Sequence, residues 1–108
     1  MVNLASRLCQ TELKAWRFLN NKNFFPKKLC GRGIPDFYAL GEFVEVKRIF
    51  QNTILFSKAQ KEKFSDEVII MGFDDDSDEP KFGRKWKDIK NCDFLKDING
   101  NMIKIVIK

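Results

Sequence analysis

The sequence predicts an α/β fold in which a small mixed β-sheet is flanked by helices. Three observations support this. An amphipathic helical pattern opens the chain, the stretch GIPDFYALGEFVEVK at residues 33–47 alternates like a hairpin around Gly41, and the apolar run VIIMGF at residues 68–73 is typical of a buried strand. A second helical pattern separates the hairpin from that run. The predicted order is therefore helix, two or three strands, helix, strand and tail, which we write αβββαβ for the core.

The chain length of 108 residues suits one domain, 1–108. We expect its core to span residues 3–73, followed by a basic tail and a C-terminal hairpin over residues 80–108. The first helix is predicted over residues 3–20, with Asn3 as its cap, and a loop over residues 21–33. The stripe of that helix consists of Leu4, Leu8, Glu12, Ala15 and Leu19.

The central hairpin is predicted from strands at residues 34–40 and 43–49. If Gly41 and Glu42 form a two-residue type II′ turn, glycine stands first, as that turn prefers. The pairs across the hairpin would then be Leu40 with Phe43, Tyr38 with Glu45, and Asp36 with Lys47. Alternation sorts the side chains into a charged face of Asp36, Tyr38, Glu45 and Lys47 and an apolar face of Phe37, Ala39, Val44 and Val46.

The second half of the chain is predicted to begin with a short helix, which Ser57 caps and which runs to about Asp66. The acidic run at residues 74–79 should be an exposed loop that points away from the charged face. Residues 81–93 are basic and weakly patterned, and we expect a helix there with Trp86 and Ile89 turned inward. A turn at Asn99-Gly100 and a last strand of sequence MIKIVIK complete the prediction.

The net charge is +5, from 20 basic and 15 acidic residues. Five acids lie in the run 74–79, so the remainder carries 20 − 10 = +10. A strongly basic remainder favours a polyanionic partner such as nucleic acid. An ordinary lysine-rich surface would give the same balance, and charge alone does not separate the two.

The cysteine and histidine content limits which kinds of metal site and which redox environment the sequence is compatible with. The sequence has no histidine, and its three cysteines, Cys9, Cys30 and Cys92, form no C-x-x-C pair, which argues against a zinc site of the usual kind. Scattered cysteines also indicate reduced thiols and an intracellular, cytoplasmic location. No apolar run approaches the ~20 residues that span a bilayer, so we expect no membrane partner.

The charged face of the hairpin suggests a divalent cation. Asp36 and Glu45 would repel each other as anions unless a cation lay between them. Lys47 partly meets this need, and Mg²⁺ or Mn²⁺ would meet it better, since both prefer oxygen ligands. The alternative is an exposed face with cross-strand ion pairs, such as Asp36 with Lys47.

Two further polar residues have two interpretations each. Glu12 interrupts the apolar stripe of the first helix, where an acid is rare unless it is paired or binds a metal. It could instead extend from the edge of the stripe toward Lys28 or Lys47. Gln60 completes a capping box with Ser57, and it could also be a polar neighbour of the charged face.

These residues together resemble the PD-(D/E)XK nuclease superfamily. Pro35-Asp36 matches the first motif and Glu45-Val46-Lys47 the second, while G-I-P-D-F, E-V-K and the following S-x-x-Q are most like the VRR-Nuc branch, which is related to Holliday junction resolvases. The resemblance covers about residues 12–73 and implies a restriction-endonuclease-like core. The tail after residue 73 matches nothing in that pattern.

The resemblance also implies roles for the matching residues. Asp36 and Glu45 would hold Mg²⁺, for which Mn²⁺ substitutes, with help from the backbone carbonyl of Val46. Lys47 would orient or deprotonate the attacking water and stabilise the developing charge. Glu12 would contact the metal directly or through water, and Gln60 would support the site.

Basic residues around this predicted site are candidates for phosphate contacts. They are Lys27, Lys28, Arg32, Arg48, Lys58 and Lys61. Phe82 and Trp86 could stack on a base or pack in the core. Asp74, Asp76 and Asp78 have the first spacing of an EF-hand loop, but its sixth position is Glu79 rather than glycine, so we reject a calcium site.

The expected function is a metal-dependent endonuclease that hydrolyses DNA, with selectivity for branched or junction DNA suited to a homodimer. Two alternatives stay open. One is a non-catalytic module that binds nucleic acid or protein and keeps the nuclease fold. The other is a nuclease directed at RNA.

Overall fold

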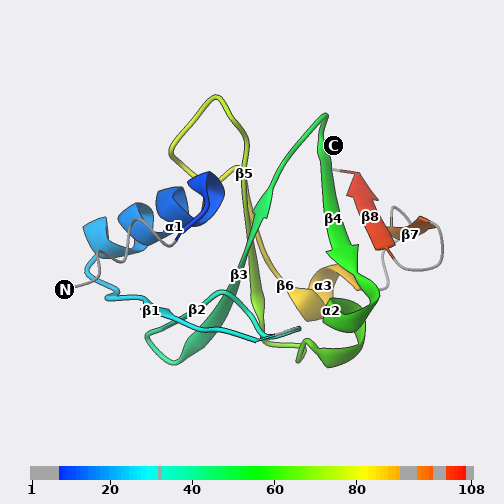
Figure 1. Cartoon of the computed structure of the whole chain (residues 1–108), viewed down its shortest axis with the longest axis horizontal. Coiled ribbons are helices and arrows are strands. Elements are labelled where there is room, and N and C mark those ends of the chain that lie inside the picture. Colours follow the sequence, from blue (N-terminus) through cyan, green and yellow to red (C-terminus); the bar gives the residue numbers. More distant parts are fainter. Residues whose placement is uncertain (1–7, 32, 91–94, 99–101, 107–108) are drawn as a thin grey trace.

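A five-stranded mixed sheet organises the computed structural model, which describes residues 8–31, 33–90, 95–98 and 102–106, with side chains described up to residue 90 (Figure 1). The strand order is β1-β2-β3-β5-β6. The parallel pair is β3 with β5, and the other neighbours are antiparallel. The strands are β1 (Lys27–Lys28), β2 (Phe37–Ala39), β3 (Glu42–Arg48), β5 (Ile69–Phe73) and β6 (Phe82–Lys85).

A second, three-stranded antiparallel sheet has the order β4-β8-β7. Its strands are β4 (Thr53–Ser57), β7 (Leu95–Ile98) and β8 (Met102–Val106). The helices of the described segments are α1 (Gln10–Asn21), α2 (Lys58–Lys63) and α3 (Trp86–Ile89). Figure 1 shows α1 on one face of the main sheet, with α2, α3 and the second sheet on the other. The predicted mixed α/β class is confirmed, although the prediction of one sheet was incomplete.

Two apolar cores result from strand alternation, which points neighbouring side chains to opposite faces. The core on the α1 side contains Ala15, Phe37, Val44, Val46 and Phe73. The core on the α2 side contains Ile49, Ile54, Phe56, Phe64, Val68, Ile70, Phe82, Trp86 and Ile89. Phe82, Trp86 and Ile89, which belong to the predicted basic tail, are part of this core, so burial continues beyond residue 73.

The hairpin register differs from the predicted one by two residues. Phe37 pairs with Val44 and Tyr38 with Phe43. The turn is therefore Leu40-Gly41 rather than Gly41-Glu42, and both residues have positive φ, 49° and 79°, as a type I′ turn requires. A leucine is a poor residue for that conformation, which is why the sequence favoured the other turn. The observed register brings the Tyr38 and Phe43 rings into an edge contact at 5.1 Å between centroids.

A slip of two residues preserves the face of every side chain, whereas a slip of one would invert it. Phe37, Val44 and Val46 accordingly lie in the core on the α1 side, as predicted. Glu45 and Lys47 point to the opposite face, where the Lys47 ammonium lies over the Phe56 ring. The predicted division into an apolar and a charged face is confirmed for these five residues, but the individual cross-strand pairs were wrong.

The ends of the first helix and of α2 also required correction. The predicted helix 3–20 begins only at Gln10, with Cys9 as its N-cap, and Asn3 lies outside the described residues. The helix α2 ends at Lys63 rather than near Asp66. Phe64 follows in an extended conformation because its side chain packs against Trp86 and Phe56.

The tail prediction was partly wrong. Residues 82–85 form a strand rather than a helix, because they pair along the open edge of β5. The short helix α3 follows, and its Trp86 and Ile89 are buried, as predicted. The last strand is confirmed over Met102–Val106 and pairs with β7 as a hairpin, while its predicted turn at Asn99-Gly100 lies outside the described residues. The predicted loop 21–33 contains the short strand β1.

Candidate active site

The site lies where β2 separates from β3. The two strands pair only as far as Phe37 and Val44, whereas β3 continues to Arg48 alongside β5. Asp36 stands at this opening, and its Oδ2 accepts a hydrogen bond of 2.8 Å from the Val46 N–H. That bond satisfies a backbone donor that β2 no longer pairs, and it holds the Asp36 carboxylate beside β3.

Among the residues whose side chains the structure describes, Glu45 is the buried charged one, with 3% of its surface exposed. Its Oε2 accepts a hydrogen bond of 2.6 Å from Gln60 Nε2 and lies 3.4 Å from Lys47 Nζ. Its Oε1 is buried and has no hydrogen-bond partner among the described residues. Burial, and then the nearby Asp36 carboxylate, raise the pKa of Glu45 to about 8.

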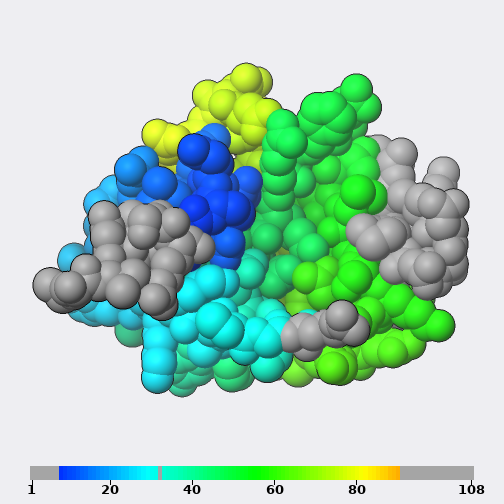
Figure 2. All heavy atoms as spheres, in the orientation of Figure 1, coloured from blue at the N-terminus to red at the C-terminus, as the bar shows by residue number. Residues whose placement is uncertain are grey.

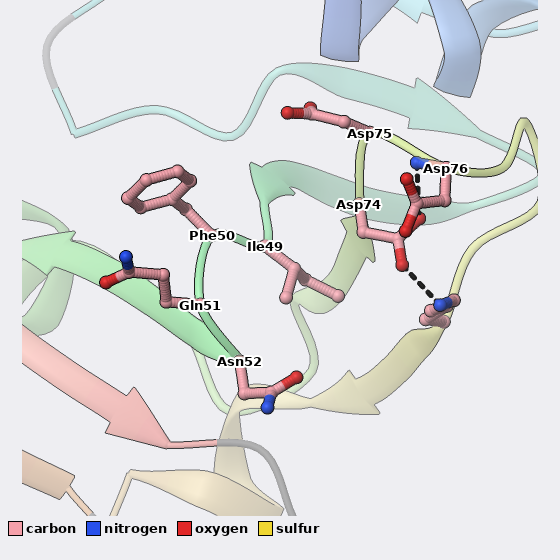
Figure 3. A pocket seen from close by; sticks show the side chains of 8 residues that line it. Ile49, Phe50, Gln51, Asn52, Asp74, Asp75 and Asp76 are labelled. Carbon is pink, nitrogen blue, oxygen red and sulfur yellow. Dashed lines mark hydrogen bonds and ion pairs between the residues drawn. The ribbon is translucent and has the colours of Figure 1, made fainter.

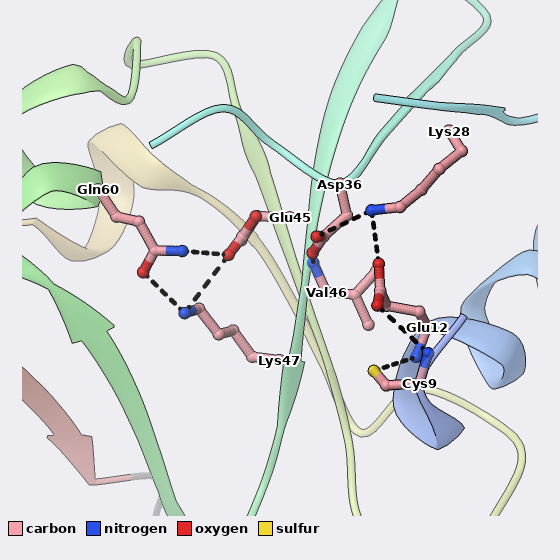
Figure 4. A network of polar contacts seen from close by, with 8 residues as sticks. All are labelled: Cys9, Glu12, Lys28, Asp36, Glu45, Val46, Lys47 and Gln60. Carbon is pink, nitrogen blue, oxygen red and sulfur yellow. Dashed lines mark hydrogen bonds and ion pairs between the residues drawn. The ribbon is translucent and has the colours of Figure 1, made fainter. Parts of the chain in front are cut away.

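Lys47 lies between Glu45 and α2 (Figure 4). Its Nζ donates a hydrogen bond of 2.8 Å to Gln60 Oε1 and lies 4.8 Å from the centre of the Phe56 ring. Burial lowers the pKa of Lys47, although Glu45 and Asp36 act in the opposite direction. The ammonium is thus held in a fixed position with little contact to solvent.

Gln60 has both of the roles that its sequence context left open. Its backbone N–H donates to Ser57 Oγ at 3.1 Å, and its Oε1 accepts from the Ser57 N–H at 3.0 Å, which completes the capping box of α2. The same side chain bonds to Glu45 and Lys47. Because α2 starts directly after β4, the cap fixes the position of the amide relative to the charged face.

Glu12 pairs with Lys28 rather than with Lys47. Lys28 Nζ lies 2.6 Å from Glu12 Oε2 and 3.5 Å from Asp36 Oδ1, so the lysine connects the two acids. Burial would by itself raise the pKa of Glu12, but the Lys28 and Cys9 hydrogen bonds lower it overall. Figure 4 shows Glu12 and Lys28 on one side of Asp36 and Glu45 on the other. The interpretation of Glu12 as an edge residue paired with Lys28 is therefore the one the structure displays.

The other basic residues predicted to contact phosphates differ in exposure and in pairing. Lys27, Lys58 and Lys61 are exposed. Arg48 forms a bidentate pair with Asp75, with N–O distances of 3.1 and 2.6 Å, so its charge is already partnered. Arg32 lies outside the described residues.

The acidic loop between β5 and β6 lines a separate hollow of ≈ 290 Å³ near the turn that follows β3 (Figure 3). Lys14 donates hydrogen bonds to the Asp74 and Ser77 carbonyls, and Lys81 pairs with the Asp74 carboxylate. These contacts place the loop at the Arg48 end of β3. Asp74 and Asp75 are thus paired with Lys81 and Arg48, and the loop forms no extension of the Asp36–Glu45 site.

The residues of the site fit a hard divalent cation. Asp36 and Glu45 supply carboxylate oxygens, and the free Oε1 of Glu45 is a buried acceptor without a donor. No group of three or more Cys, His, Asp or Glu side chains that could hold a metal occurs within the described ranges. Two carboxylates still suffice for Mg²⁺, which commonly keeps several waters and takes further oxygens from a substrate phosphate.

One contact and two residues at or beside the site were not predicted from the sequence. Lys28 was named as a phosphate contact and a partner of Glu12, but its link to Asp36 was missed. Phe56 was not named, because its position over Lys47 depends on β4 crossing to the second sheet. Lys63 was overlooked among many lysines, although its i, i+3 spacing from Gln60 along α2 was a usable signal.

Comparisons with known proteins found no family model that matches the chain and no significant match among curated proteins or solved structures. The functional assignment therefore rests on the geometry of the site itself. In the part of the chain that the structure describes, no helix is long and apolar enough to cross a membrane.

Proposed function

We propose that this protein is a Mg²⁺-dependent endonuclease that hydrolyses phosphodiester bonds of DNA. The observation that carries the proposal is the buried Glu45 side chain beside Asp36, whose Oε1 has no hydrogen-bond partner within the described part of the chain. Burying a charged group that lacks a full set of hydrogen-bond or ion-pair partners costs roughly several kcal/mol of folding free energy. A strongly raised acid pKa next to a second carboxylate marks a candidate functional site, because active sites use burial and like-charged neighbours to shift pKa values.

Each residue of the site has a part in this proposal. Asp36 and Glu45 would hold Mg²⁺, and Mn²⁺ would substitute for it. The metal ion would supply charge neutralisation at the scissile phosphate and a lower pKa for an attacking water. Lys47 would orient the water and stabilise the charge that develops on the phosphate, since its Nζ is already fixed by Gln60.

Gln60 and Lys28 would act as positioning residues. Gln60 fixes one oxygen of Glu45 and leaves the other available. Lys28 restrains Asp36 from the α1 side. In this account Glu12 would act through Lys28, or reach the metal through water, as the resemblance to the PD-(D/E)XK nucleases implies.

The arrangement of the elements supports a restriction-endonuclease-like core as part of the proposal. An antiparallel β2–β3 hairpin carries the two acids, β5 lies parallel to β3, and α1 and α2 lie on opposite faces of the sheet. A protein of this size covers little DNA. A homodimer with selectivity for branched DNA would allow two symmetric cuts, and it belongs to the same proposal.

A non-catalytic binding module is the second candidate, and one observation favours it. Lys28 already neutralises Glu12 and contacts Asp36, so part of the acidic charge is balanced without a metal. A module of this kind would bind DNA with no need for Mg²⁺ and would not cleave it.

A cleavage assay separates the two candidates. Supercoiled, linear, single-stranded and four-way-junction DNA would be incubated with Mg²⁺, Mn²⁺ or EDTA, and RNA of the same sequence would test the other polymer. We expect metal-dependent cleavage of DNA that Asp36→Asn and Lys47→Ala abolish and that the exposed-acid control Glu62→Gln retains. Binding without cleavage under every condition would favour the non-catalytic module.

A further inference from the structure

A hollow of ≈ 500 Å³ adjoins the site on the charged side of the hairpin. Its lining consists of Gly33, Ile34, Pro35, Phe43, Lys63, Phe64, Ser65 and Val68. In Figure 2 the cyan part of the chain, which leads to β2, lies close to the green part that contains β4 and α2. The proposed catalytic residues do not line this hollow, and its use is not explained by the hydrolysis chemistry.

Three of the residues that line the hollow lie close in sequence to residues of the proposed site. Pro35 directly precedes Asp36, and Phe43 lies two residues before Glu45 on the same face of β3. Phe64 follows Gln60 by one helical turn, and its N–H donates to the Gln60 carbonyl at 2.9 Å. Two residues along a strand span about 7 Å, a distance that one nucleotide bridges.

The hollow presents an aromatic surface. Phe43 has 44% of its surface exposed, and the neighbouring Tyr38, with 39% exposed, contacts its ring edge-on. The Tyr38 contact fixes the orientation of the Phe43 ring and leaves much of it free. Ile34, 47% exposed, adds apolar surface on the opposite wall. Exposed aromatic rings beside a basic surface are typical of sites on which unpaired bases stack.

The adjoining helix supplies positive charge. Lys63 lines the hollow, and Lys58 and Lys61 are exposed on the same six-residue helix, together with one acid, Glu62. None of the three lysines forms an ion pair within the described residues. An apolar hollow bordered by free cations suits a ligand that is flat and apolar at one end and anionic at the other.

We propose that this hollow binds an unpaired base of a single-stranded DNA segment, next to the phosphate that the Asp36–Glu45 site would cleave. Phe43 is the stacking surface and Lys63 the phosphate contact. A base within a duplex is stacked on both sides and cannot enter a hollow. The inference rests on the proposed function, and it narrows the substrate to DNA that contains unpaired nucleotides, such as single strands or flaps.

The test measures binding in EDTA, where no cleavage occurs. Fluorescence polarisation would compare a labelled 12-nucleotide single strand, the same strand with one abasic position, and a duplex, for wild type, Phe43→Ala, Phe43→Trp and Lys63→Gln. The control variant is Phe50→Ala, which removes another exposed phenylalanine, 56% exposed, that does not line this hollow. Circular dichroism and melting curves would verify that each variant is folded.

We expect Phe43→Ala to weaken single-strand binding roughly 5- to 100-fold, with duplex binding nearly unchanged. Phe43→Trp and Phe50→Ala should stay close to wild type. Abasic substitution should weaken wild type but not Phe43→Ala. Lys63→Gln should reduce the salt dependence of single-strand binding by about 0.7 in log–log slope.

Three outcomes would overturn the inference alone. The first is metal-dependent cleavage with unchanged single-strand affinity in Phe43→Ala. The second is an equal loss of affinity in Phe43→Ala and Phe50→Ala. The third is an equal loss of affinity for duplex and single strand in Phe43→Ala. Absence of both DNA binding and cleavage in wild type would instead remove the proposed function and the inference together.

Discussion

Gln60 donates a hydrogen bond of 2.6 Å from Nε2 to Glu45 Oε2. The other end of the same amide accepts hydrogen bonds from Lys47 Nζ and from the Ser57 backbone. One glutamine therefore caps α2 and fixes two residues of the charged face. Mutation can separate the two roles of Gln60, because it caps α2 through Ser57 and supports the site through Glu45 and Lys47.

Ser57→Ala removes the cap and leaves the Gln60 side chain free to contact Glu45. We expect it to lower the free energy of unfolding by about 0.5–2 kcal/mol and to leave cleavage close to wild type. Gln60→Ala should cost similar stability and reduce cleavage roughly 10- to 100-fold. Urea denaturation and a nicking assay would measure both effects. Equal losses of activity in the two variants would show that Gln60 acts only through the helix.

Glu45 should make the protein less stable as the pH rises. Its pKa is raised from 4.5 to about 8, so between these values the native state binds more protons than the unfolded state. The free energy of unfolding therefore falls across this window, by an amount on the order of a few kcal/mol.

Glu45→Gln should remove this dependence, because the amide does not ionise. We expect the variant to melt at a higher temperature than wild type at pH 8 and at a similar temperature at pH 5, while losing cleavage. Glu62→Gln is the control, since Glu62 is exposed. A wild-type melting temperature as high at pH 8 as that of Glu45→Gln would contradict the assignment of a buried, strained carboxylate.

Mg²⁺ should compete with the proton on Glu45. Below a pH of about 8 the proton must leave before the carboxylate can bind the ion, so affinity should rise up to tenfold for each pH unit. Titration calorimetry at pH 6 and 7.5 would measure this without any DNA. Asp36→Asn should weaken binding at both values. Equal wild-type affinities at the two pH values would show that Mg²⁺ does not bind at Glu45.

The Glu12–Lys28 pair should contribute to stability as well as to position. Both side chains are about one-fifth exposed, so we expect a coupling energy of about 1 kcal/mol in a double-mutant cycle of Glu12→Gln and Lys28→Met. Glu12→Gln should also lower cleavage less than Asp36→Asn does. A loss as large as that of Asp36→Asn would mean that Glu12 contacts the metal directly.

The sequence was sufficient to predict which residues share a face of the hairpin, but not how the strands pair. Alternation of apolar and polar residues determines the face, and a shift of two residues leaves it intact. The register depends on which residues form the turn. The observed turn places Leu40 at a positive φ that leucine rarely adopts, and the resulting register brings Tyr38 into contact with Phe43.

Long-range contacts were harder to predict. The link from Glu12 through Lys28 to Asp36 joins three segments, and only one half of it was anticipated. The strand at Phe82 was mistaken for a helix because four residues show no clear periodicity, and β5 decides their pairing. The position of Phe56 over Lys47 depends on a second sheet that local pattern does not reveal.

The central claim is that Asp36, Glu45 and Lys47 form a metal-dependent cleavage site. The most direct test is nicking of supercoiled plasmid by wild type, Lys47→Met and Glu62→Gln, purified in parallel, with Mg²⁺ and with EDTA. We predict nicking by wild type and Glu62→Gln with Mg²⁺ only, and none by Lys47→Met. Equal nicking by Lys47→Met and wild type, or nicking that persists in EDTA, would contradict the account.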